Sequence, residues 1–181
     1  MDARLTLPER ATSARGFRER QAQLDRIVRE EMPRNRREIQ EAKEFGDLSE
    51  NFEYESARNR ERQLIERQSR LREELSGMEV FDFAALPEPG GVAGPGARVT
   101  LAYGDGSRRT ISILGDWDSD EALGIVSRRA PLARAVEGRR AGETCIVEFP
   151  DPDFDGEFVE ETVSVEAVEP LSAEVLAWAA G

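Results

Sequence analysis

The chain has 181 residues, 34% of them charged and 39% hydrophobic, a balance that fits neither a disordered nor a membrane-spanning protein. It has no histidine and one cysteine, Cys145, which excludes Ser-His-Asp and Cys-His catalysis, His-ligated zinc and an internal disulfide. A net charge of −12 argues against binding nucleic acid mainly by neutralising phosphates. We therefore expect a soluble cytoplasmic protein without a membrane segment, whose chemistry, if any, uses carboxylates.

The distribution of charge divides the chain into two parts. Residues 1–76 hold 17 basic and 17 acidic side chains, whereas residues 77–181 hold 8 basic and 20 acidic ones. Proline and glycine are dense between residues 87 and 96, where a helix cannot continue. We predict an N-terminal domain, a linker, a second domain and a C-terminal tail, with the boundaries 1–80, 81–96, 97–170 and 171–181.

The N-terminal domain is rich in strong helix formers, namely Glu, Arg, Gln, Ala and Leu. In its second half apolar side chains recur every seven residues, at Ala57, Leu64, Leu71 and Met78, and a thinner stripe runs through the first half. This spacing is typical of a coiled coil, and neither arm is apolar enough to stand alone. We therefore predict an antiparallel α-helical hairpin with its tip at residues 44–51. Pro33 lies within the first arm and should kink or break it.

The predicted tip carries two acidic residues, Asp47 and Glu50. One explanation is local, because Asp47 with Glu50 three residues later resembles a capping box for the second helix. The other is chemical, because two carboxylates on a projecting tip can give oxygen ligands to Mg²⁺. Since Mg²⁺ requires further ligands, such a pair would work best inside another molecule's metal site. The residues alone leave both explanations open.

The second domain alternates in polarity as strands do. The predicted strands cover residues 97–103, 110–114, 144–149 and 161–168, and a short helix covers 131–136 with proline in its first turn. Strands around one short helix indicate a small α+β domain. Two acidic stretches are interpreted as a solvated loop and a turn: Asp116, Asp118, Asp120 and Glu121 in the first, and residues 151–157 in the second.

Two segments carry a recognisable pattern. The first consists of Ala42, Lys43, Glu44, Gly46, Asp47, Leu48, Ser49, Glu50, Asn51, Glu53, Tyr54, Ala57 and Arg58. The second is Ile-Val-Ser-Arg-Arg-Ala-Pro-Leu-Ala-Arg-Ala at residues 125–135. Together they resemble the signatures of the bacterial transcript-cleavage factors GreA and GreB, and the resemblance covers roughly residues 12–171.

The resemblance implies an FKBP-like second domain that docks on RNA polymerase at the rim of the secondary channel, while the hairpin enters the channel. Ala130, Pro131, Leu132 and Ala133 match the docking segment. Asp47 and Glu50 match the pair that assists the second Mg²⁺ of the polymerase active site and the attacking water. The polymerase then cleaves the 3′ end of its own backtracked RNA and resumes synthesis.

It also implies a monomer that is not itself an enzyme, has no cofactor of its own and binds no metal stably alone. Nascent RNA would be contacted only within the polymerase complex. Lys43 and Arg58 match basic positions near the RNA, although charge on a helix surface explains them equally well.

Some residues depart from the family pattern. Phe45 and Phe52 flank the tip where histidine and alanine are common, and Ala130 stands in place of serine. The phenylalanines would stack on a base, wedge against the channel wall or, as we favour, pack across the hairpin mouth. An alternative function therefore stays open, that of a Gre-like regulator or inhibitor that occupies the channel without promoting cleavage.

Overall fold

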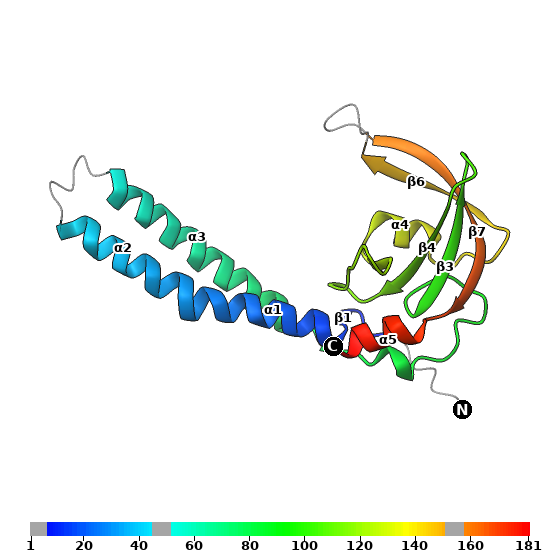
Figure 1. Ribbon diagram of the computed structural model, residues 1–181, viewed down its shortest axis with the longest axis horizontal. Helices are drawn as coiled ribbons and strands as arrows, with labels where there is room; N and C mark the ends of the chain where they lie inside the picture. The colour runs from blue at the N-terminus through cyan, green and yellow to red at the C-terminus, as the bar shows by residue number, and fades with distance from the viewer. Residues whose placement is uncertain (1–6, 45–51, 151–157) are drawn as a thin grey trace. The chain divides into compact units, whose positions relative to one another are not determined.

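The computed structural model describes residues 7–44, 52–150 and 158–181 (Figure 1). The chain forms two compact units, one of residues Phe17–Met78 and the other of residues Met1–Gly16 together with Glu79–Gly181. The first is the predicted helical hairpin and the second contains the predicted sheet, so the α+β class is confirmed. The unit boundaries differ from the predicted ones, because residues before Phe17, the expected linker and the expected tail all belong to the sheet unit.

The hairpin is built from two helical arms that lie side by side in Figure 1. The first arm comprises α1 (Ala14–Arg26), the π-helical segment η1 (Ile27–Glu31) and α2 (Met32–Glu44). The second arm is the single helix α3 (Phe52–Leu75). None of the helices that the structure describes is long and apolar enough to cross a membrane.

Pro33 does not interrupt the first arm. Proline has no amide hydrogen, and in an α-helix its ring would clash with the carbonyl four residues earlier. The π-helical segment ends at Glu31, two residues before Pro33, and the amide of Met32 donates to the carbonyl of Ile27, five residues back. The helix therefore continues past Pro33 without a break. The first arm accommodates this proline with a π-helical turn just before it, in place of the predicted kink or break.

The seven-residue pattern forms the buried seam of the hairpin. Ala57, Leu64, Leu71 and Met78 are all 8% exposed or less. Ile27 of η1 is completely buried against Leu64 and Leu71. These contacts confirm the seam that the sequence predicts.

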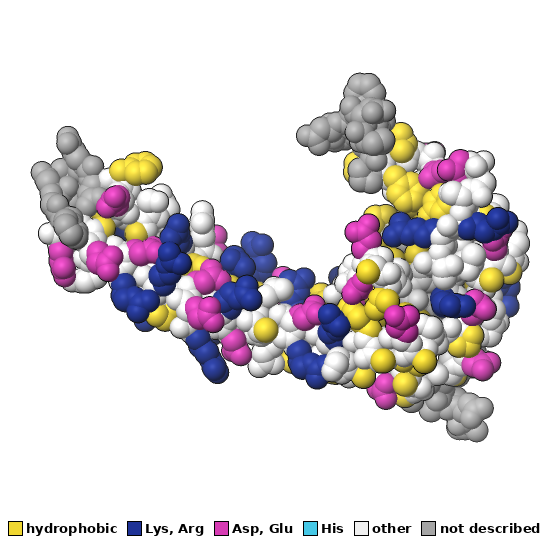
Figure 2. Space-filling model, in the orientation of Figure 1, with side chains coloured by type: hydrophobic (Ala, Val, Ile, Leu, Met, Phe, Trp, Pro, Cys, Tyr) yellow, Lys and Arg dark blue, Asp and Glu magenta, His cyan; other side chains and the backbone are white. Residues whose placement is uncertain are grey.

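A polar contact and several ion pairs accompany the apolar seam. Asn35, 1% exposed, donates its amide Nδ2 to the carbonyl of Ala57 at 3.1 Å. A buried asparagine in a coiled coil favours one register, because a shifted register would leave its amide unpaired. Ion pairs between the arms join Arg60 to Glu38 at 2.9 Å, and Arg67 to Glu31 at 3.8 Å. Side chains of both signs cover the outer surface of the hairpin in Figure 2.

The second unit is organised by a five-stranded sheet with the strand order β5-β4-β3-β7-β6. Strands β4 and β5 are parallel, and every other neighbouring pair in this sheet is antiparallel. The strands are β3 (Ala97–Tyr103), β4 (Arg108–Leu114), β5 (Ile125–Ser127), β6 (Thr144–Pro150) and β7 (Phe158–Pro170). The predicted strands coincide with β3, β4, β6 and β7, whereas the three-residue β5 was not predicted.

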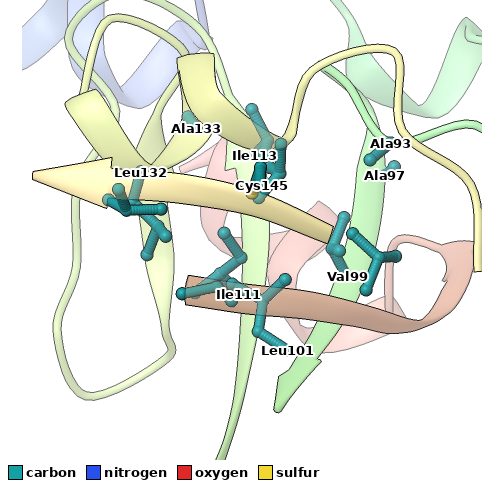
Figure 3. Close-up of a cluster of buried hydrophobic side chains, with 13 residues drawn as sticks. Ala93, Ala97, Val99, Leu101, Ile111, Ile113, Leu132, Ala133 and Cys145 are labelled. Atoms are coloured by element: carbon teal, nitrogen blue, oxygen red, sulfur yellow. The ribbon is translucent and has the colours of Figure 1, made fainter. Parts of the chain in front are cut away.

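One face of the sheet and the short helix α4 (Pro131–Val136) enclose the main core. Figure 3 shows side chains of this cluster between the strands and α4. Helix α4 contributes Leu132, Ala133 and Val136, and the strands contribute Val99, Leu101, Ile111, Ile113, Cys145, Val147, Val163 and Val165. The helix bounds agree with the predicted range.

A second apolar cluster incorporates segments predicted to be a linker and a tail. The 3₁₀ turn η2 (Phe83–Ala85) buries Phe83, and helix α5 (Ala173–Ala180) buries Val175 and Ala179. Ser172 caps α5 by accepting from the amide of Val175 at 3.3 Å. Nearby, the short strand β1 (Ala11–Thr12) pairs in parallel with β2 (Glu79–Val80). These segments are therefore part of the folded unit rather than a free linker and tail.

The hairpin seam can be tested by comparing two adjacent residues of α3. We expect Leu64→Ala to reduce the free energy of unfolding by about 2–4 kcal/mol, because Leu64 is 5% exposed and its truncation leaves a cavity. Ile65→Ala is the control, since Ile65 is 49% exposed, and should cost less than about 1 kcal/mol. Urea unfolding followed by circular dichroism at 222 nm measures both. Equal losses would contradict the assigned seam.

Candidate functional site

The acidic pair predicted at the hairpin tip lies outside the described residues. Asp47 and Glu50, like Phe45, fall within residues 45–51. What the structure describes is the two helix ends that this segment joins, because α2 ends at Glu44 and α3 begins at Phe52. The assignment of Asp47 and Glu50 therefore stays a prediction from sequence.

The residues that flank the tip are at the surface. Lys43, in the last turn of α2, and Arg58 of α3 are both exposed. Arg58 forms an ion pair with Glu61 on its own helix. Phe52 is 82% exposed, so the preferred prediction that it packs across the hairpin mouth is wrong. A groove beside it is lined by Glu38, Glu41, Ala42, Phe52, Glu53, Ser56, Ala57 and Arg60.

The predicted docking segment, Ala130 to Ala133, forms the start of α4. Ala130 occupies the N-cap position with φ −63° and ψ 144°, and it provides no side-chain cap because alanine has no acceptor. Leu132 and Ala133 are 7% and 2% exposed, so their side chains belong to the core. Pro131 and the neighbouring Arg134 are exposed and form the accessible part of this segment.

An arginine-rich pocket of about 230 Å³ lies beside α4. Its lining residues are Glu9, Arg128, Arg129, Arg134 and Glu137. The buried carboxylate of Asp116 pairs with Arg128 at 2.5 Å and with Arg129 at 2.6 Å. The hydrogen bond between Arg129 and Asp116 raises the pKa of Arg129. Arg128 also donates to the backbone carbonyls of Pro8 and Glu9, which attaches the N-terminal segment to this surface.

Asp118 is completely buried and accepts hydrogen bonds at both carboxylate oxygens. One oxygen accepts from the hydroxyls of Thr12 at 3.1 Å and Ser13 at 2.6 Å. The other accepts from the amides of Ser13 at 2.9 Å and Gly115 at 2.8 Å. The Ser13 hydroxyl in turn accepts from the amide of Gly16 at 3.0 Å, which makes Ser13 the cap of α1. Asp118 thus holds the start of α1 in the sheet unit.

The prediction of a solvated acidic loop is therefore wrong for three of its four residues. Asp116 and Asp118 are buried, and Asp120 is half-buried and accepts from the indole N–H of Trp178 at 2.9 Å. Only Glu121 among them is exposed. Within the described ranges, no three or more Asp, Glu and Cys side chains gather in a way that could hold a metal ion. The spacing of these residues does not indicate their donors, which range from Arg128, 12 positions from Asp116, to Thr12, 106 positions from Asp118.

The role of Asp118 predicts a large effect from a small change. Asp118→Asn keeps the side-chain size but replaces one acceptor oxygen with an N–H₂ group that faces donors. We expect a loss of about 2–3 kcal/mol in the free energy of unfolding, because buried donors lose a charged acceptor. Asp105→Asn is the control, since Asp105 accepts from Ser107 at 2.8 Å in an exposed turn. Urea melts that shift equally for the two variants would contradict the account.

Comparison with known proteins identifies the family. A model described as transcription elongation factor, N-terminal, matches residues 11–80, and one described as transcription elongation factor, GreA/GreB, C-terminal, matches residues 88–169. GreA of Alkalilimnicola ehrlichii is 36% identical over 149 residues, which cover 82% of this chain and 94% of the relative. GreA of Pseudomonas aeruginosa is 33% identical over 154 residues, covering 84% and 95%.

A crystal structure of GreA factor homolog 1 (Gfh1) of Thermus thermophilus aligns with 22% identity and a TM-score of 0.37, over 89% of this chain and 99% of that one. The family models together span most of the chain, and the sequence relatives cover more than two thirds of it. The resemblance seen in the two sequence motifs is confirmed. The chain belongs to the GreA/GreB family of transcription elongation factors.

Proposed function

We propose that this protein binds RNA polymerase at the secondary channel and stimulates the polymerase's own Mg²⁺-dependent cleavage of the 3′ end of backtracked RNA. One observation carries the proposal: the two hairpin arms end at Glu44 and Phe52, and the seven residues that connect them contain Asp47 and Glu50. In a member of this family, a carboxylate pair placed where the two helices meet supports a role at the partner's active centre.

The hairpin has the dimensions and surface that such a role requires. At ~1.5 Å per residue, the 24 residues of α3 span about 36 Å. Two helices packed along a narrow seam form a thin rod, a shape that supports the proposed entry into the channel. On the face seen in Figure 2, charged side chains of both signs cover much of the hairpin and keep the rod hydrated.

The chemistry proposed for the tip is assistance to a metal site of the polymerase. Asp47 and Glu50 would each offer a carboxylate oxygen to the second Mg²⁺ and would orient the attacking water. Two metal ions stabilise the attacking and leaving oxygens of an in-line displacement, which cleaves a phosphodiester bond of the RNA. Lys43 and Arg58, exposed on the two helices beside the tip, would lie near RNA phosphates.

The catalytic unit in this proposal is the polymerase complex, not the isolated factor. Two carboxylates on a tip lack the further ligands and the shaped, dry cavity that metal catalysis needs. The proposed factor therefore has no cofactor of its own, acts as a monomer and meets nascent RNA only when bound to polymerase. The exposed part of the α4 start, Pro131 and Arg134, would contribute to docking at the channel rim.

The first test of this function concerns the tip. Asp47→Asn and Glu50→Gln should each slow stimulated cleavage at least about tenfold, or ~1.4 kcal/mol of transition-state stabilisation. The amides keep the size of the side chains but remove the charge that a Mg²⁺ ligand supplies. The measurement is single-turnover RNA cleavage in a stalled, backtracked elongation complex, with the factor at saturating concentration.

Matched amide variants away from the tip control for the loss of charge. Asp25→Asn in α1 and Glu73→Gln in α3 alter exposed carboxylates and should cleave at the unaltered rate. The factor without polymerase should leave RNA intact at any Mg²⁺ concentration. Full cleavage by both tip variants, with normal melting curves, would make Asp47 and Glu50 helix caps and would favour the regulator that binds without promoting cleavage.

The second test separates docking from chemistry. Arg134→Glu should weaken polymerase binding by about tenfold, because it reverses an exposed charge that lies next to the docking segment and lines the arginine-rich pocket. Arg140→Glu, an exposed reversal elsewhere in the same unit, should bind normally, and so should Asp47→Asn. Competition binding with labelled factor gives the dissociation constants. If Asp47→Asn weakened binding as much as Arg134→Glu, the tip would be an anchor and the division of roles would be wrong.

A further inference from the structure

Helix α5 lies beyond both ranges matched by the family models, and its Trp178 contacts Arg15 in the first turn of α1, a turn that belongs to the same unit as α5. The indole of Trp178 in α5 is positioned between two elements of the sheet unit. Its N–H donates to Asp120 at 2.9 Å, and the guanidinium carbon of Arg15 lies 4.6 Å from the ring centroid. Arg15 is the second residue of α1, so a cation–π contact joins α5 to the first turn of that helix.

The same turn is also held by Asp118, which accepts hydrogen bonds from the capping residue Ser13. Packing there is so close that two glycines have no space for a side chain. A Cβ on Gly16 would lie 2.4 Å from an Asp118 carboxylate oxygen, and a Cβ on Gly115 would lie 2.5 Å from the carbonyl oxygen of Ala11. Residues 12–16 therefore contact both the 115–118 loop and α5, and they belong to the sheet unit although they directly precede the hairpin in the sequence.

The two places where the chain passes between the units differ in structure. At Gly16–Phe17 the chain passes within α1, as continuous helix. At Met78–Glu79 it returns after a turn in which Gly77 adopts a φ of 79°. The first turn of α1 is therefore part of the sheet unit and is continuous, as helix, with the first arm of the hairpin.

We propose that Trp178 is a positioning residue, and that α5 acts as a brace that keeps the first turn of α1 formed through Arg15 and Asp120. When the brace is lost, the Ser13 cap opens more often and the hairpin is carried on a frayed helix. The functional part of this inference rests on the proposed cleavage role, because a tip on a frayed helix occupies its working position for a smaller fraction of the time. Docking would be unaffected, since Pro131 and Arg134 take no part in the brace.

Two substitutions at Trp178 separate its two contacts. Trp178→Phe keeps an aromatic face for Arg15 but loses the N–H that Asp120 accepts, whereas Trp178→Leu loses both and keeps an apolar side chain. Arg15→Gln removes the cation alone. Arg108→Gln is the matched control, because it breaks an exposed ion pair with Glu166 in the same unit, away from α1. The full-length protein is used throughout.

The direct readout is hydrogen–deuterium exchange of the amides of residues 14–20, with the amides of β3 and β7 as internal reference. We expect exchange at the start of α1 to rise about threefold in Arg15→Gln, the effect of one half-buried cation–π contact, and more in Trp178→Leu. Arg15→Gln should accelerate exchange less in the Trp178→Leu background than in the unaltered protein, because the contact between Arg15 and Trp178 is already lost there. The reference amides and the Arg108→Gln protein should not change.

Cleavage supplies the second readout. Trp178→Leu should lower the saturating cleavage rate at least threefold while the half-saturating factor concentration changes less than twofold. A purely structural role of Trp178 would change both the saturating cleavage rate and the half-saturating factor concentration, or it would change neither. Unchanged exchange at residues 14–20 in Trp178→Leu, or equal acceleration in β3 and β7, would overturn the brace. If the unaltered factor failed to stimulate cleavage, the proposed function would fall, while the exchange result would still decide the brace.

Discussion

The buried carboxylate of Asp118 is the constraint on which the arrangement of the sheet unit depends. A charge that is completely removed from water requires hydrogen bonds at both oxygens, and Thr12, Ser13 and Gly115 supply them. These donors come from segments more than 100 positions apart, so the chain must bring its N-terminal residues to the loop after β4. The parallel pairing of β1 with β2 and the attachment of residues 8 and 9 to Arg128 follow from the same placement.

The hairpin is stabilised by different interactions from those that stabilise the sheet unit. Its buried seam is a narrow strip formed by apolar residues of both arms together with Asn35. Most of its exposed side chains are charged, and their ion pairs contribute little each. This division suits the proposed function, because the rod needs length and solubility while the docking unit needs a fixed surface.

The sequence predicted those features that depend on local patterns. The bounds of β3 and α4 follow from alternation and from a proline at the first helical turn, and the seven-residue spacing located Leu64 and Leu71 in the seam. The partners of Asp116, Asp118 and Asp120 could not be predicted, because nothing near these residues indicates a donor at Ser13, Arg128 or Trp178. Helix α5 was missed although Ser172 before a run of helix formers is a capping signal. The candidate site was predictable only as a motif, because Asp47 and Glu50 lie outside the described residues.

The most direct test of the account is the Mg²⁺ dependence of RNA cleavage in backtracked elongation complexes. Cleavage rates are measured over a range of Mg²⁺ concentrations without factor, with the unaltered factor and with the double variant Asp47→Asn, Glu50→Gln. If the tip lends ligands to the polymerase's second Mg²⁺, the unaltered factor will lower the half-saturating Mg²⁺ concentration and the double variant will not. The account would be contradicted if both proteins shifted the Mg²⁺ dependence equally, since the carboxylates would then have no part in the metal site.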